Sequence, residues 1–120
     1  MPSTVQPMII TADLPRLQRF YTELLDAKET ERFPQDGPAF FVGLRIGDSD
    51  LGLVNDAGVE PGAGQRMLIS VDVADVDGLL GRVEPLAGRV EGPPTDMPWG
   101  QRVVHLKDPD GNAVNLTQQL

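Results

Sequence analysis

Two strand patterns joined by a tight turn constrain the fold more than any other feature of this chain. The turn at residues 108–112 has the sequence DPDGN, in which Pro presets φ and Gly or Asn accepts a positive φ. The flanking segments 103–106 and 113–117 mix β-branched residues with alternating small or polar ones. This alternation is typical of strands that bury one face only. The stretch therefore predicts a β-hairpin with one face toward polar surroundings.

The first part of the chain predicts one helix among four strands. An apolar strand is expected at 5–11, after which Asp13 occupies an N-cap position and can accept the free amides of the first helical turn. Pro15 is tolerable because it falls in that turn. Apolar residues three and four apart form the helical stripe, namely Leu14, Leu17, Phe20, Tyr21 and Leu24. The further strands are expected at 28–33, 40–46 and 51–54.

The same order of elements then starts again. Segment 56–65 is rich in Gly and Pro and has no periodicity, so it predicts a linker between module one (1–55) and module two (66–120). Module two is expected to contain a strand at 66–71, a helix capped by Asp75 that ends near 85–88, a short strand at 89–91, and the hairpin. The pattern predicts a single α+β domain of two βαβββ modules, an internal duplication that forms a curled, half-open barrel with a shared cleft.

Composition excludes several classes of protein. A chain of 120 residues is the size of one domain, and the lack of cysteine excludes disulfides, thiolate zinc sites and cysteine nucleophiles. The net charge of −8 disfavours nucleic acid as a partner, and it indicates either attraction for a cationic ligand or solubility alone. No apolar run approaches the length of a membrane span, so a cytoplasmic protein without a membrane partner is expected. No catalytic triad, phosphate-binding loop or dinucleotide fingerprint is present.

Short motifs in both modules resemble one known superfamily. Module one contributes Asp13-Leu14, Phe20-Tyr21 and Leu24-Leu25, and module two contributes Pro98-Trp99-Gly100 and the DPDGN turn. Together they resemble the vicinal-oxygen-chelate superfamily over nearly the whole chain. Its members include glyoxalase I, extradiol dioxygenases, fosfomycin-resistance enzymes and bleomycin-resistance proteins. The resemblance implies the fold, but the same scaffold serves unrelated chemistries.

The resemblance also identifies where metal ligands would lie. Metal-dependent members place a His, Gln or Glu early in the first strand of each module and a Glu near the end of the last strand. Counted from the shared motifs, these places fall on Gln6, Gly52, Arg66 and Asn115. Glycine has no side-chain donor, a guanidinium repels a divalent cation, and an amide lacks carboxylate charge. We therefore expect no metal and no other cofactor.

The bleomycin-resistance branch is the closest match by resemblance. Pro7 lies in the first strand, where that branch has a proline at the point where the strand crosses to the partner subunit. Trp99 follows Pro98 as in that branch, whose tryptophan lies beside a drug groove at the dimer interface. The resemblance implies a metal-free, strand-exchanged homodimer that sequesters an antibiotic or other aromatic natural product. The alternative is a metal-dependent lyase, isomerase or dioxygenase of the same superfamily that acts on a small metabolite.

Eight residues are candidates for binding the ligand. Trp99 either stacks on a planar ligand or anchors its own loop, and His105 either acts as a general base or forms a polar wall. Arg66 pairs either with an acidic ligand or with an internal carboxylate. Adjacent strand residues face opposite sides, so one of two phenylalanines is expected in the cleft and the other in the core. The full set is Gln6, Met8, Phe40, Phe41, Arg66, Trp99, His105 and Asn115.

Overall fold

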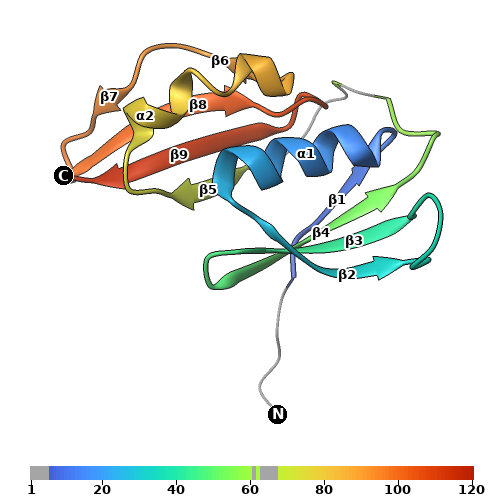
Figure 1. Cartoon of the computed structure of the whole chain (residues 1–120). Coiled ribbons are helices and arrows are strands. Elements are labelled where there is room, and N and C mark those ends of the chain that lie inside the picture. Colours follow the sequence, from blue (N-terminus) through green and yellow to red (C-terminus); the bar gives the residue numbers. More distant parts are fainter. Residues whose placement is uncertain (1–5, 61, 63–67) are drawn as a thin grey trace. The chain divides into compact units, whose positions relative to one another are not determined.

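The chain divides into two compact units, Met1–Glu60 and Pro61–Leu120 (Figure 1). The computed structural model describes residues 6–60, 62 and 68–120. Each unit contains one mixed sheet and helical segments, and neither sheet closes on itself, so the α+β class is confirmed. The internal duplication and the homodimer stay predictions.

The first unit has one helix and a four-stranded sheet. Strand β1 is parallel to β4, and the other pairs are antiparallel in the order β1-β4-β3-β2. The predicted strand at 28–33 is confirmed with the same bounds, and β1 begins at Met8 rather than at residue 5, which lies outside the described residues. The elements are β1 (Met8–Thr11), α1 (Leu14–Leu25), β2 (Lys28–Phe33), β3 (Phe41–Ile46) and β4 (Ser49–Asn55).

Helix α1 forms as its sequence predicts. The Asp13 carboxylate accepts a hydrogen bond from the backbone N–H of Arg16 at 3.2 Å, and Pro15 lies in the first turn. Asp26 ends the helix in the left-handed conformation, with φ of 55°. The predicted apolar stripe is buried in full: Leu14, Leu17, Phe20, Tyr21 and Leu24.

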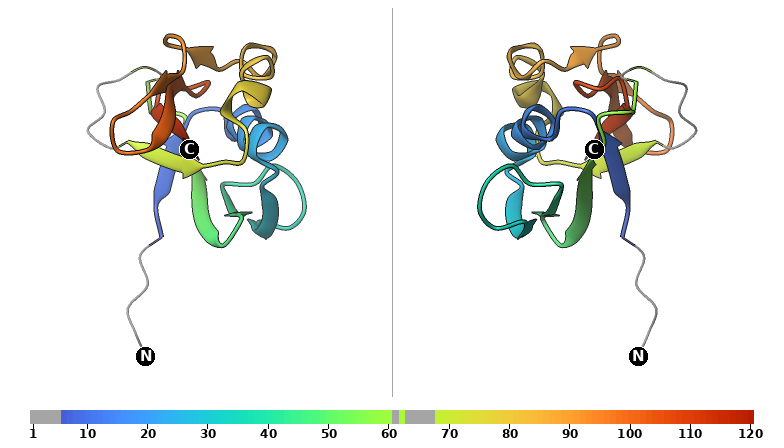
Figure 2. Two further views of the ribbon diagram at one scale, coloured as in Figure 1. Left: turned by 90° about the vertical axis from the view of Figure 1, so that its left-hand side faces the viewer. Right: turned by 90° about the vertical axis from the view of Figure 1, so that its right-hand side faces the viewer.

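The helix covers one face of its sheet, as the views in Figures 1 and 2 show. Alternate strand residues supply the buried side of this sheet, among them Ile9, Val42, Leu44, Leu51 and Leu53. The intervening residues project from the opposite side. We call this side, which carries Met8, Ile10, Phe41, Gly43, Gly52 and Val54, the open face of the first unit.

The second unit contains a sheet in the order β5-β9-β8-β6, with β7 also paired to β8. Strands β8 and β9 form the predicted antiparallel hairpin. The buried side chains include Val76, Val104, Leu106, Val114 and Leu116. The elements are β5 (Ile69–Asp72), α2 (Val76–Leu80), the short 3-10 helix η1 (Glu84–Leu86), β6 (Arg89–Val90), β7 (Thr95–Asp96), β8 (Gln101–Lys107) and β9 (Ala113–Gln119).

Two elements of this unit differ from the sequence prediction. Helix α2 begins at the predicted cap Asp75 but ends at Leu80, and the chain continues as η1. A continuous helix would place Pro85 in its interior, where the missing N–H and the ring both oppose helix formation. Strand β7 was not predicted, because it is only two residues long and exists through its pairing with Val103 and Arg102 of β8.

The predicted turn between β8 and β9 is held by one buried carboxylate. Asp108 accepts hydrogen bonds from the backbone N–H of Asp110 at 3.0 Å and of Asn112 at 2.9 Å. It also accepts one from the Asn112 amide at 2.8 Å. Gly111 has a φ of +85°, which a residue with a side chain rarely adopts. The turn therefore fixes the register of the hairpin through its own residues.

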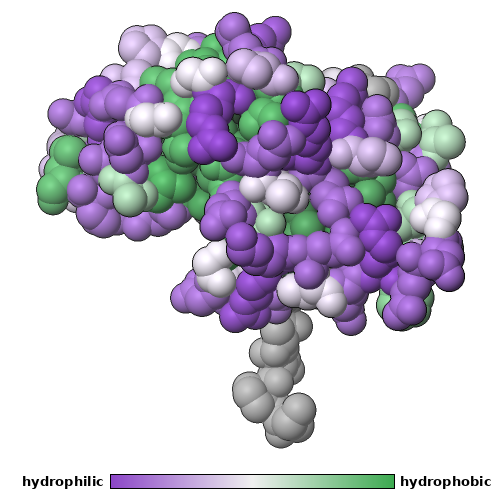
Figure 3. All heavy atoms as spheres, viewed as in Figure 1, coloured by the Kyte–Doolittle hydropathy of each residue, from purple (hydrophilic) through white to green (hydrophobic). Residues whose placement is uncertain are grey.

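One face of the molecule is mainly polar (Figure 3), in keeping with the net charge. Figure 3 shows hydrophilic residues over most of the face that it presents, with apolar atoms visible between them. Among the helices in the described part of the chain, none has the length and apolar character needed to cross a membrane.

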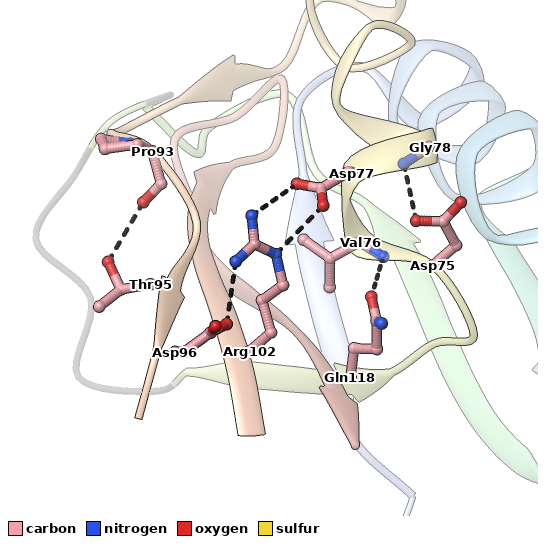
Figure 4. Close-up of polar contacts among 9 residues, drawn as sticks. All are labelled: Asp75, Val76, Asp77, Gly78, Pro93, Thr95, Asp96, Arg102 and Gln118. Carbon is pink, nitrogen blue, oxygen red and sulfur yellow. Dashed lines mark hydrogen bonds and ion pairs between the residues drawn. The ribbon is translucent and has the colours of Figure 1, made fainter. Parts of the chain in front are cut away.

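Arg102 links three elements of the second unit (Figure 4). Its guanidinium donates to both carboxylate oxygens of Asp77 on α2, each at 3.1 Å, and to Asp96 on β7 at 2.9 Å. The hydrogen bond to Asp77, followed by that to Asp96, raises the pKa of Arg102 above its ordinary value. On β9, the side chain of Gln118 accepts a hydrogen bond at 2.8 Å from the N–H of Val76, the first residue of α2. These contacts place α2 on one side of its sheet, and no described helix of this unit contacts the other side through them.

Candidate functional site

The open face of the first unit is apolar around β1 and where β2, β3 and β4 carry Phe33, Phe41 and Val54, whereas Glu31, Arg45 and Asp50 lie further along the same side. Met8 and Ile10 of β1 are 47% and 50% exposed, and Phe33 at the end of β2 is 54% exposed. Phe33 is the register partner of Phe41, which in turn pairs with Val54. A side of a sheet that carries this much exposed apolar surface is typical of a region that contacts a ligand or a partner.

Two glycines lie side by side in the middle of this open face. Gly43 of β3 and Gly52 of β4 are register partners. A Cβ atom added to Gly52 would lie 2.2 Å from the Met8 sulfur and 3.3 Å from the ring of Phe41. The Met8 thioether thus occupies the space that a side chain at position 52 would take. Because methionine is unbranched and flexible, it can move from this position to adapt to a bound molecule.

The open face of the second unit is polar. It is the side of the sheet opposite α2, and one row across it consists of Ser70, Asn115 and His105, which are register partners on β5, β9 and β8. The ring nitrogen Nδ1 of His105 lies 2.6 Å from Oδ1 of Asn115. In the next row, the hydroxyl of Thr117 donates to Asp72 at 2.9 Å. The structure therefore joins two residues that the sequence analysis proposed separately.

The hairpin turn carries the signal that could have predicted this pair. Residues equally distant from the centre of the 108–112 turn face each other, so His105 pairs with Asn115 just as Lys107 pairs with Ala113. Ser70 was not predicted, since its place beside Asn115 depends on a parallel pairing between strands far apart in sequence.

Trp99 lies just before the same sheet. Its indole N–H donates to the side chain of Gln101 at 2.9 Å, and 67% of its surface is exposed. The ring is therefore not a buried anchor for its loop. Gln101 and His105 are four residues apart on the same side of β8, which corresponds to about 13 Å along the strand.

The remaining candidates occupy different surroundings. Gln6 is exposed and precedes β1. Phe40 is 60% exposed, and Phe41 is half-buried on the open face of the first unit. The expectation that one of these rings lies in the core is therefore wrong, because residue 40 precedes β3 and has no buried layer around it. Arg66 lies outside the described residues.

Comparison with known proteins identifies the family. Residues 4–116 match the Glyoxalase/Bleomycin resistance protein/Dioxygenase superfamily. The chain belongs to this superfamily. The predicted superfamily is thus confirmed, whereas the closer placement in the bleomycin-resistance branch stays a prediction. No curated protein matches the chain.

Solved structures of the superfamily fold are similar over almost their whole length. TioX from Micromonospora sp. ML1 has a TM-score of 0.77 at 21% identity, covering 99% of this chain and 100% of TioX. A family enzyme from Burkholderia phytofirmans PsJN has a TM-score of 0.80 at 22% identity, covering 96% of this chain and 97% of that one. The fosfomycin resistance protein FosX from Mesorhizobium loti has a TM-score of 0.72 at 21% identity, covering 100% of this chain and 95% of FosX. These similarities show the fold.

The residues at the superfamily's metal-ligand places do not fit a divalent metal. The places that the resemblance gives are Gln6, Gly52, Arg66 and Asn115, of which Arg66 lies outside the described residues. Gly52 has no side chain, and Gln6 and Asn115 offer neutral amides, whereas Mn²⁺, Fe²⁺ or Zn²⁺ sites rely on carboxylate and imidazole ligands. Within 6–60, 62 and 68–120, no group of three or more His, Cys, Asp or Glu side chains could hold a metal ion.

Proposed function

We propose that this member of the glyoxalase and bleomycin-resistance superfamily is a metal-independent binding protein that sequesters an aromatic natural product, such as an antibiotic. The observation that carries the proposal is the apolar open face of the first unit, with Met8 lying over Gly52. A flat ring can approach a sheet closely only where side chains are absent. Gly52 provides such a position when the flexible Met8 side chain moves aside, whereas side-chain atoms of Thr30 and Glu31 lie over Gly43.

The energetics favour an apolar ligand. Complete burial of one large apolar side chain contributes about 1.5–3 kcal/mol, and roughly half of Met8, Ile10 and Phe33 is exposed. Covering these exposed halves therefore supplies about 2–4 kcal/mol. On the second unit, taken by itself, an aromatic ring stacked on the exposed Trp99 contributes about 0.5–1.5 kcal/mol beyond area burial.

The superfamily context supports an antibiotic as the ligand. FosX, which shares this fold, is a fosfomycin resistance protein. The competing metal-dependent lyase, isomerase or dioxygenase needs side chains that coordinate a metal ion. The described residues do not offer them, and the register pairs Met8–Gly52 and Ser70–Asn115 are examples of what lies there instead. Binding without turnover needs no metal-coordinating side chains.

Binding should change the fluorescence of Trp99, the only tryptophan in the chain. We expect a saturable change on titration with hydroxymethylanthraquinone, bleomycin or mitomycin, and recovery of the compound unchanged by mass spectrometry. In calorimetric titrations, Trp99→Ala should weaken binding by about 1–3 kcal/mol, as expected for a truncated aromatic contact. Trp99→Phe keeps a ring and should restore part of the affinity.

Two outcomes would argue against sequestration. A chemically altered product formed in molar excess over the protein would show an enzyme instead. A fluorescence signal that stays linear with every compound would show no specific site.

We further propose that the chain forms a symmetric homodimer. The proposal is supported by the exposed apolar residues of the open face and by the end strands, β1 and β2 in one sheet and β5 and β6 in the other, whose outer edges pair with no other strand of the described residues. Light scattering should give twice the chain mass of 13.0 kDa at micromolar concentration. A mass of a single chain under these conditions would contradict the dimer while leaving ligand binding to be judged by the titrations.

A further inference from the structure

The hydrogen bond between His105 and Asn115 has a definite chemical direction. Oδ1 of Asn115 is a carbonyl oxygen, which only accepts, so Nδ1 of His105 at 2.6 Å must carry the hydrogen. In a neutral imidazole with the proton on Nδ1, the second nitrogen, Nε2, holds a lone pair and accepts hydrogen bonds. The geometry therefore implies one tautomer of the ring.

The strands around this pair keep the ring on the polar open face of the second unit. Val104 and Leu106, on either side of His105, are buried with 0% and 1% exposure, which fixes the orientation of β8. The backbone carbonyl of His105 accepts from the N–H of Glu91 at 2.9 Å. The His105 side chain is exposed, and among the described residues its only hydrogen-bond partner is Asn115. Nε2 is thus available to a bound molecule.

We infer that Asn115 positions His105 so that Nε2 serves as a hydrogen-bond acceptor, which makes the pair a specificity determinant for ligands with an O–H or N–H donor. An analogue whose donor is blocked by a methyl group leaves the Nε2 lone pair without a partner and loses affinity. The selection of ligands rests on the function proposed above. The tautomer is independent of it.

The tautomer can be measured directly, because His105 is the only histidine of the chain and gives the only imidazole signals. A long-range proton–nitrogen correlation spectrum should be recorded at mildly alkaline pH, where an ordinary imidazole is neutral. It should show Nδ1 protonated and Nε2 unprotonated. Asn115→Asp still offers only acceptor oxygens and should keep this tautomer. Asn115→Leu removes the acceptor and should shift the ring toward the Nε2–H form that predominates for imidazoles in water. An Nε2–H tautomer in the native protein would overturn the inference.

The selectivity can be measured with a matched pair of compounds, hydroxymethylanthraquinone and its methyl ether. The native protein should bind the alcohol about three- to tenfold more tightly than the ether, as expected for one neutral hydrogen bond. His105→Phe and Asn115→Leu should bring the ratio of the two affinities to about one, whereas Asn115→Asp should retain the preference. Equal affinities in the native protein would overturn the ligand part of the inference. If neither compound binds, both the proposed function and this ligand part are contradicted, whereas an Nδ1–H tautomer would still confirm the role of Asn115.

Discussion

Replacing Phe20 by alanine should lower the free energy of unfolding by about 3–5 kcal/mol. Phe20 is completely buried on α1, and its ring meets that of Tyr21 edge to face, with the centroids 5.1 Å apart. Truncation removes the buried area and leaves a cavity that the surrounding side chains can fill only in part. The loss is a large fraction of the roughly 5–15 kcal/mol that stabilises a typical domain.

Urea unfolding followed by circular dichroism measures this effect, with the slope of the transition checked for two-state behaviour. Phe40→Ala is the matched control, because it makes the same chemical change at a ring that is 60% exposed. We expect the control to change the free energy of unfolding by less than about 0.5 kcal/mol. Similar losses for both variants would show that α1 is not packed as described.

Replacing Gly52 by leucine should weaken ligand binding by about 100-fold or more, equivalent to about 2.7 kcal/mol. A side chain at this position takes the place of the Met8 sulfur, since even a Cβ would lie 2.2 Å from it. The displaced Met8 and the new side chain then lie between the sheet and a flat ligand, so that the ligand can no longer contact the sheet closely. The experiment rests on the proposed function, because it measures affinity for hydroxymethylanthraquinone by calorimetry.

Gly92→Leu is the matched control for this experiment. A Cβ at Gly92 meets no atom of the described residues within 4 Å, so the same change should leave both stability and affinity close to those of the native chain. The unfolding transition of Gly52→Leu must also be recorded, to show that the variant is folded. A folded Gly52→Leu protein with native affinity would show that the ligand does not bind at the open face of the first unit.

Local signals predicted most of the secondary structure. Helix α1 follows from the Asp13 cap and from apolar residues such as Leu17, which lie at helical spacing. The hairpin of β8 and β9 follows from the turn chemistry around Asp108, whose carboxylate accepts hydrogen bonds from Asp110 and Asn112 within the turn itself. Such elements are predictable because the interactions that stabilise them are between near neighbours in sequence.

The candidate site was predicted only as separate residues. Met8, Trp99, His105 and Asn115 were each identified, but no local pattern indicates that Met8 lies over Gly52. The placement of Phe40 failed for a related reason, since strict alternation holds only inside a strand and β3 begins at Phe41.

The sequence by itself determined the α+β class, helix α1 and the hairpin, since each depends on caps, turns and periodicities that a short segment carries. The superfamily followed from the resemblance of motifs in both modules to those of known members. Only the tertiary structure decided the composition of the two open faces. The parallel pairings of β1 with β4 and of β5 with β9 place Met8 beside Gly52 and Ser70 beside Asn115, across more than 40 residues of chain. Strand pairing over such separations is selected by the fit of whole buried faces, such as those that contain Leu53 and Leu116, and no single residue encodes it.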